Sequence, residues 1–137
     1  MIGEDGLELL SEAECLRLLG DASIGRVAVS IGALPAVFPV NFTLVDGEII
    51  FKTAEGTKLA AALAHAVVAF EVDAIDAMYH EGWSVMVVGP AEEVTDAIEL
   101  ERLRNAPVMP WAGGQRDHIV RIRPEFTSGR RITHVVS

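Results

Sequence analysis

A group of lysine and threonine side chains lies where a predicted strand is followed by a predicted helix. Lys52 and Thr53 end the strand, the chain turns through Gly56, and Thr57 and Lys58 begin the helix. Backbone N–H groups at a helix start, the helix dipole, two hydroxyls and the lysines together favour an anion, and a terminal phosphate is the natural occupant. The alternative is that Thr57 only caps the helix while Lys52 and Lys58 are solvated surface charges.

Other side chains could line a planar ligand. Asn41 lies in a predicted strand beside Pro39, which cannot donate a hydrogen bond to a neighbouring strand, and its amide could pair with a donor and an acceptor of a heterocycle. Trp83 and Ser84 follow a glycine that permits close approach, and Trp83 offers a flat apolar wall. Trp111, in a proline-rich loop, could add a second wall. The plainer interpretations are a solvent-facing Asn on an edge strand, and tryptophans that belong to a core or an interface.

Alternation of apolar and polar residues predicts the strands that would position these side chains. We expect strands at 24–31, 36–45, 48–53, 67–73, 84–94, 118–123 and 131–136. Asp46-Gly47 is typical of a tight hairpin turn, and Gly89-Pro90 indicates a bulge or bend. Six or seven antiparallel strands with short inserted helices predict an all-β barrel with helical decorations rather than βαβ units.

Three short helices are expected between these strands. Ser11 and Glu14 form a capping box for the first, whose apolar face is Ala13, Leu16 and Leu19 and which ends at Gly20. Cys15 flanks that face and is expected to be a packing residue. The second helix runs from Lys58 to about Ala64, and the third follows a Thr95 cap over 96–105. A loop is expected over 76–82.

Charge and composition exclude several classes of protein. The 137-residue chain has a formal net charge of −9, which argues against a nucleic-acid or anionic-membrane binder because those partners need a basic surface. Mean hydropathy is +0.34, yet no apolar run approaches the roughly 20 residues that span a bilayer. We expect one cytoplasmic domain over residues 1–137 that buries apolar surface in a dimer. The single Cys15 excludes an intrachain disulfide, and the four scattered histidines indicate no metal site.

Several segments, taken in order, resemble the pyridoxamine 5'-phosphate oxidase-like, flavin-binding split-barrel family. The segments are GRVAV (25–29), PVNF (39–42), FKT–GTK (51–58), FEVD (70–73), GWSVMVVG (82–89) and VRIRPEFTSGRR (120–131). The likeness covers roughly residues 11 to 134. It implies a mainly β fold with small α insertions, an antiparallel split β-barrel of Greek-key type, and a homodimer with two flavin mononucleotide (FMN) sites between its subunits.

The resemblance also implies a set of cofactor-binding residues: Pro39, Val40 and Asn41 along the isoalloxazine ring, Lys52, Thr53, Thr57 and Lys58 at the phosphate, and Trp83 and Ser84 passing the ring from the other side. Trp111 joins this set through its loop. The arginine-rich substrate signature of the true oxidases is reduced to Arg130 and Arg131, which argues against the vitamin B6 reaction itself. The expected function is a flavin-dependent oxidoreductase acting on a small molecule.

Two alternatives stay open at this point. Some relatives use a deazaflavin coenzyme, although the negative net charge argues mildly against its anionic tail. The second alternative is a non-catalytic module that carries flavin, haem or nothing. No acid–base pair stands out in the sequence, and Ser84 and Tyr79 are the nearest candidates for a general acid.

Overall fold

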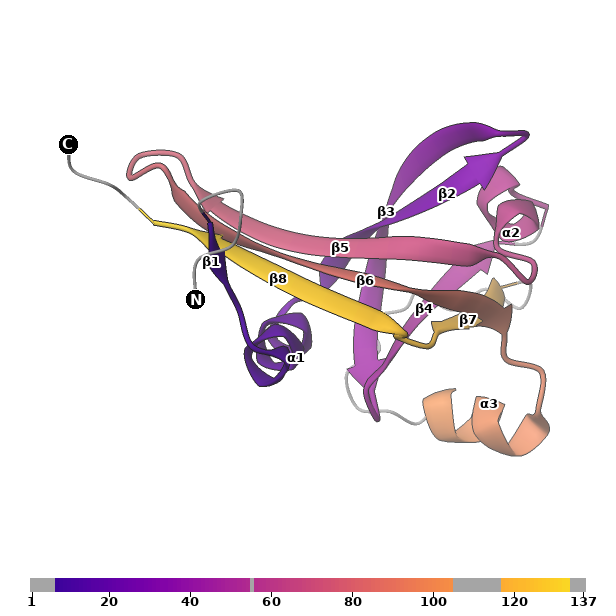
Figure 1. Ribbon diagram of the computed structural model, residues 1–137. Helices are drawn as coiled ribbons and strands as arrows, with labels where there is room; N and C mark the ends of the chain where they lie inside the picture. Colours follow the sequence, from indigo (N-terminus) through magenta and orange to yellow (C-terminus); the bar gives the residue numbers. More distant parts are fainter. Residues whose placement is uncertain (1–6, 55, 105–116, 134–137) are drawn as a thin grey trace.

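Six antiparallel strands close a barrel in the part of the chain that the computed structural model describes, residues 7–54, 56–104 and 117–133 (Figure 1). The order around the barrel is β6-β5-β2-β3-β4-β7, and β7 pairs back with β6. Two more strands, β8 and then β1, extend the sheet beyond β6. The bounds are β1 Glu8–Leu9, β2 Ile24–Ile31, β3 Leu34–Val45, β4 Glu48–Ala54, β5 Val67–Asp76, β6 Glu81–Glu93, β7 Asp117–Ile122 and β8 Phe126–Ile132. The predicted mainly β barrel is confirmed.

The β3–β4 hairpin forms where the sequence predicts it. Asp46 and Gly47 both have positive φ, at 51° and 79°, the conformation that a two-residue turn between twisted strands needs. Elsewhere the strand ends differ from prediction. β5 runs on to Asp76 and β6 begins at Glu81, so the expected 76–82 loop is a shorter hairpin connection. The final strand, predicted at 131–136, begins earlier, since β8 spans Phe126–Ile132, and residues 134–136 of the prediction lie outside the described residues.

Strand β6 changes partner at Gly89. It pairs with β8 over 82–88 and with β7 over 91–93, while its register with β5 continues through Gly89 and Pro90 without an extra residue. The predicted bulge is therefore a partner switch. A Cβ on Gly89 would lie 1.8 Å from the carbonyl oxygen of Arg123. Only glycine lets the chain that links β7 to β8 cross so close to β6.

Inward side chains from all six barrel strands fill the barrel. Phe42 of β3 and Phe70 of β5 meet edge to face, with ring centroids 4.8 Å apart and an interplanar angle of 71°. The Phe70 ring covers Gly25 of β2 so closely that a Cβ there would be 2.3 Å from its Cζ. The ring therefore needs glycine at position 25. Phe51 and Ile49 of β4 are buried in the same core.

Helix α1, Glu12–Asp21, packs against β8 through a face that differs from the predicted one. Its buried residues are Cys15, Leu18 and Leu19, and it continues past Gly20. Cys15 is a packing residue, as expected, because its sulfur lies over Gly129 of β8, where a Cβ would approach it to 2.5 Å. The predicted Ser11 cap is confirmed, since the Ser11 hydroxyl accepts from the Glu14 N–H at 3.2 Å.

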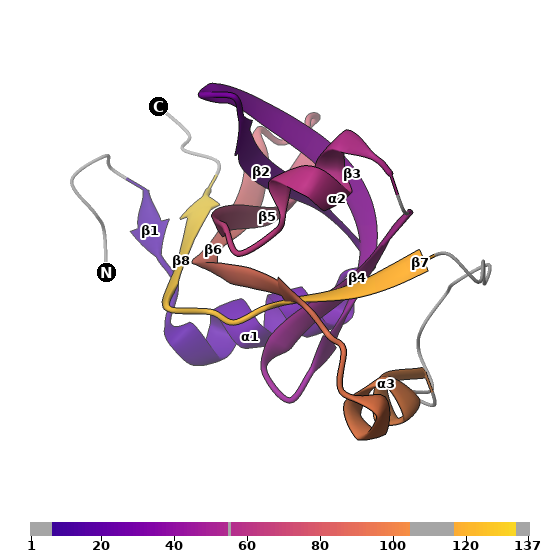
Figure 2. The same cartoon turned by 90° about the vertical axis from the view of Figure 1, so that its right-hand side faces the viewer.

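The two other helices are α2, Lys58–Ala62, and α3, Ala97–Arg104. Asp96 rather than Thr95 caps α3, because its carboxylate accepts from the Glu99 N–H at 3.1 Å. A second apolar cluster, which includes Ile50, Val94, Leu103 and Ile119, lies beneath α3. Figure 2 shows α2 across one end of the barrel and α3 beside β4 and β7. None of the described helices is long and apolar enough to cross a membrane.

Candidate functional site

A charged cluster lies on the outer face of the sheet formed by β3, β2, β5, β6 and β8. The register aligns Pro39, Arg26, Glu71 and Met86 in one row across four of these strands. Arg26 Nη1 donates to Glu71 Oε1 at 3.0 Å and to Asp73 Oδ2 at 2.7 Å. Arg26 is thereby fixed directly beside Pro39.

The cluster shifts the pKa values of its members. Partial burial, and then the neighbouring Asp73 carboxylate, raise the pKa of Glu71, and the opposing effect of Arg26 does not outweigh them. The same carboxylates, Asp73 first, raise the pKa of Arg26, so the guanidinium stays charged. This surface therefore combines a permanent positive charge with a carboxyl group that takes up a proton more readily than an ordinary glutamate.

A hollow of about 370 Å³ opens beside this cluster, where β5, β6 and β8 run together. Ser84 of β6 lies in register between Asp73 of β5 and Arg130 of β8. Ile75 and Ile132 supply apolar walls, and Glu71 and Asp73 supply polar ones. Apolar walls with a few polar groups along one edge are typical of sites for small ligands and cofactors.

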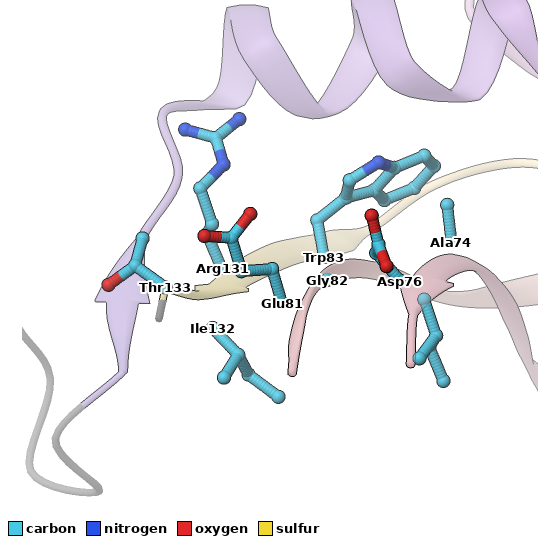
Figure 3. A pocket seen from close by; sticks show the side chains of 9 residues that line it. Ala74, Asp76, Glu81, Gly82, Trp83, Arg131, Ile132 and Thr133 are labelled. Atoms are coloured by element: carbon cyan, nitrogen blue, oxygen red, sulfur yellow. The ribbon is translucent and has the colours of Figure 1, made fainter. Parts of the chain in front are cut away.

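A second hollow, of about 360 Å³, lies at the same sheet end and shares Ile75, Trp83 and Ile132 with the first (Figure 3). Trp83 and Arg131 extend toward α1 in this view, whereas Ile132 extends away from it. Arg131 Nη2 donates to Glu14 Oε1 at 2.9 Å, which ties β8 to α1. Trp83 lines both hollows, whereas Ser84 lines only the first one.

A sequence comparison identifies the family of this chain. A family model for pyridoxamine 5'-phosphate oxidase matches residues 11–131. The chain belongs to this family. It is 39% identical over 128 residues to an uncharacterized protein of Mycobacterium tuberculosis, a match that covers 90% of this chain and 84% of the relative.

Solved structures place the chain among similar barrels. An FAD-binding protein from Mycobacterium smegmatis superimposes with a TM-score of 0.84 at 36% identity, over 92% of this chain and 98% of that one. An FAD-binding protein from Mesorhizobium loti superimposes with a TM-score of 0.78 at 27% identity, over 93% of this chain and 99% of that one. The oxidase-family barrel therefore accounts for nearly the whole described chain.

Within this oxidase-family barrel, the predicted ring-binding residues fall on two faces. Pro39 and Asn41 are exposed on the outer face of β3, and Ser84 is half-buried on the outer face of β6. Val40 turns inward and packs against the core, and Trp83 packs against it as well. The structure therefore brings Pro39 and Ser84 to the same sheet surface, on either side of the Arg26 cluster. Trp111 lies outside the described residues.

The predicted phosphate-binding residues lie at the end of β4 and the start of α2. Lys52 and Thr53 are consecutive in β4, so their side chains face opposite sides, and Thr53 is only 4% exposed. The Thr57 hydroxyl caps α2 as the plainer interpretation had it, because it accepts from the Ala60 N–H at 3.1 Å and donates to the Ala54 carbonyl at 2.9 Å. Lys58 is exposed at the first position of α2. The phosphate site remains a prediction from the resemblance.

Sequence reasoning missed the Arg26–Glu71–Asp73 cluster. Alternation alone places each of these residues on the polar face of its own strand, but 45 residues separate Arg26 from Glu71. Their contact depends on β2 pairing with β5, which is not sequential in the chain. The usable signal was charge complementarity between an isolated basic residue in one strand and two acidic residues, spaced by two, in another.

Proposed function

We propose that this member of the pyridoxamine 5'-phosphate oxidase family is a flavin-dependent oxidoreductase that works as a homodimer. The observation that carries the proposal is the match, over 92% of the chain, to a structure whose protein binds FAD. FAD contains FMN as one half, so the residues predicted for FMN would serve either cofactor. The flavin, when bound, supplies hydride or electron transfer, and the protein supplies orientation and a dry pocket.

The residues on the outer face fit a flavin. Exposed Pro39 and Asn41 offer a flat surface and an amide that can pair with a ring edge. Arg26, held by two carboxylates beside Pro39, supplies a fixed positive charge next to the predicted ring position. Lys52 and Lys58 are the predicted cations for the phosphate. Ser84 lies on the strand expected to pass the ring from its other side.

The homodimer is supported by the apolar character of the same outer face. On this face the exposed fractions of Val37, Ile75 and Phe126 are 60%, 77% and 70%. Met86 of β6 is 41% exposed. Exposed apolar side chains around the Arg26 cluster are of the kind that a subunit interface buries. A second copy that covers this face would bury these residues and would enclose the cofactor between the subunits.

The spectrum of the purified protein tests the cofactor. We expect a visible flavin band that either co-purifies or saturates at one flavin per subunit on titration with FMN or FAD. Chromatography of the heat-released cofactor then distinguishes the two. Reduction by a nicotinamide cofactor followed by reoxidation would support the enzyme, and a bound but redox-silent flavin would support a non-catalytic module instead. Failure to bind either flavin would refute the proposal.

Substitutions test the phosphate and the interface separately. Lys58→Ala should weaken flavin binding by about 1.5–3 kcal/mol through loss of a charge-assisted bond, whereas Arg104→Ala, an exposed cation at the end of α3, should not. Met86→Lys should dissociate the dimer in analytical ultracentrifugation and lower flavin affinity with it. A monomeric variant that keeps full affinity would contradict the shared site.

A further inference from the structure

A hollow of about 490 Å³ lies at the opposite end of the barrel from the two hollows around Trp83. Strand β4 ends here at Ala54, β6 ends at Glu93, β7 begins, and α2 lies across the opening (Figure 2). A barrel of this size is normally filled by side chains. Here the segment over the opening presents Gly56, Ala60 and Ala64 to the hollow, and these residues are too small to fill it.

Thr53 is the buried polar residue of this hollow. It lines the hollow and is only 4% exposed. Its Oγ1 has no hydrogen-bond partner among the described residues. Buried hydroxyls are almost always paired, because leaving one unpaired costs free energy. Oγ1 is buried in this rotamer, and rotation about the Cα–Cβ bond would turn it toward the hollow. The hydroxyl is therefore available to a ligand in the hollow.

A histidine–carboxylate pair stands next to this hydroxyl. The register places His118 of β7 directly opposite Thr53, and Nδ1 of His118 contacts Oε1 of Glu93. When neutral His118 donates from Nδ1 to Glu93, its Nε2 becomes an acceptor. Glu93, His118 and Thr53 then supply three acceptors to a hollow that His65 and Thr95 also line.

The charges around the hollow favour a ligand that brings N–H donors. Glu92 also lines the hollow, but Arg121 and Arg123 already donate to it at 2.7 and 2.9 Å. Glu93 therefore carries the carboxylate charge that a ligand can reach, and a phosphate or other anion would be repelled by it. A primary ammonium has three N–H donors, which matches the three acceptors. Leu63 and Val120 supply apolar walls for the body of the ligand.

We propose that this hollow, lined by Thr53, Glu93 and His118, binds a small organic amine with a compact apolar body. The site is separate from the outer face that holds Arg26, since it lies at the mouth of the barrel under α2. It shares Thr53 with the predicted phosphate-binding residues, but its acceptors do not require a bound flavin. The two proposals can therefore fail independently.

Titration of the whole protein with benzylamine tests the site, and benzoate serves as the probe of the same shape and opposite charge. The imidazole NMR signals of His118 should shift and saturate with benzylamine, with an affinity on the order of 1 mM, which is reasonable for so small a ligand. The signals of His80, which lies in the β5–β6 connection, should not shift. Benzoate should produce no saturable change.

Two variants and a competition experiment complete the test. Glu93→Gln keeps the shape of the side chain, removes its charge and should weaken benzylamine at least tenfold, whereas Glu101→Gln on the exposed surface of α3 should leave the affinity unchanged. Thr53→Val should weaken benzylamine without lowering the thermal midpoint. Equal binding of benzoate, or an unchanged affinity in Glu93→Gln, would overturn the proposal. Competition between benzylamine and FMN would overturn the claim of a separate site.

Discussion

Replacement of Gly89 by alanine should strain the barrel where β6 changes partner. A Cβ at this position would lie 1.8 Å from the carbonyl oxygen of Arg123 and 2.8 Å from its carbonyl carbon. Ordinary carbon–oxygen contacts begin near 3.3 Å, so the two backbones must separate by about 1.5 Å. The obstruction is backbone on both sides, and rotation of a side chain cannot relieve it.

The expected cost follows from the hydrogen bonds at the crossing. The Arg123 N–H donates to the Pro90 carbonyl at 3.2 Å, and the Glu125 N–H donates to the Val88 carbonyl at 2.9 Å. Loss of both bonds costs about 1–3 kcal/mol, and the steric strain of the added methyl group adds about 1–3 kcal/mol. We therefore expect Gly89→Ala to lower the free energy of unfolding by about 2–6 kcal/mol, a large part of the usual total of about 5–15 kcal/mol.

Urea unfolding followed by circular dichroism measures this loss, and Gly20→Ala is the matched control. Gly20 lies within α1, and a Cβ there meets Leu44 at an ordinary 4.0 Å. The same chemical change should therefore stabilise the protein by about 0.5–1 kcal/mol, since alanine favours helix over glycine. If Gly89→Ala unfolds within about 0.5 kcal/mol of the wild type, or if both variants lose the same stability, the close-crossing argument is wrong.

Three further predictions concern other parts of the molecule. Arg121 donates to Glu99 at 2.8 Å and lowers the pKa of Glu99 below its ordinary 4.5, so Glu99→Gln should reduce the urea midpoint at about pH 7 and have no effect at about pH 2, where the carboxylate's contribution is already lost. Burial raises the pKa of the Cys15 thiol, so a thiol reagent should modify Cys15 at the rate of unfolding, and rapid modification of the native protein would contradict its packing role. Phe42→Ala should cost about 3–5 kcal/mol in chemical denaturation, because it removes a fully buried ring in contact with Phe70.

The strands were predictable because the alternation of apolar and polar residues is a local property of the chain. The Asp46-Gly47 turn was predictable for the same reason, since its two positive φ values depend on those two residue types. The buried face of α1 was not predictable from the helix alone. Cys15 is buried because a glycine on β8, 114 residues later, leaves room for its sulfur, and Leu16 is left partly exposed.

The candidate site was likewise predictable only where it depends on local sequence. Alternation alone places Pro39 and Asn41 on one side of their strand, and both are exposed on the outer side of β3. The same rule places Lys52 and Thr53 on opposite sides of β4, and the phosphate site stays a prediction. The contact of Arg26 with Asp73 depends on which strands become neighbours, and this is decided by barrel closure rather than by local sequence.

The position of β6 also has a consequence for synthesis on the ribosome. Three strands flank β6, and two of them, β7 and β8, are translated after it. When only β1 to β6 have emerged from the ribosome, one edge of β6 is therefore unpaired. One edge of β4 is also unpaired until β7 is synthesised. Open edges of this kind invite pairing with other chains. We expect stalled nascent chains that lack β7 and β8 to depend on chaperones, and to lose that dependence once Ile132 has emerged.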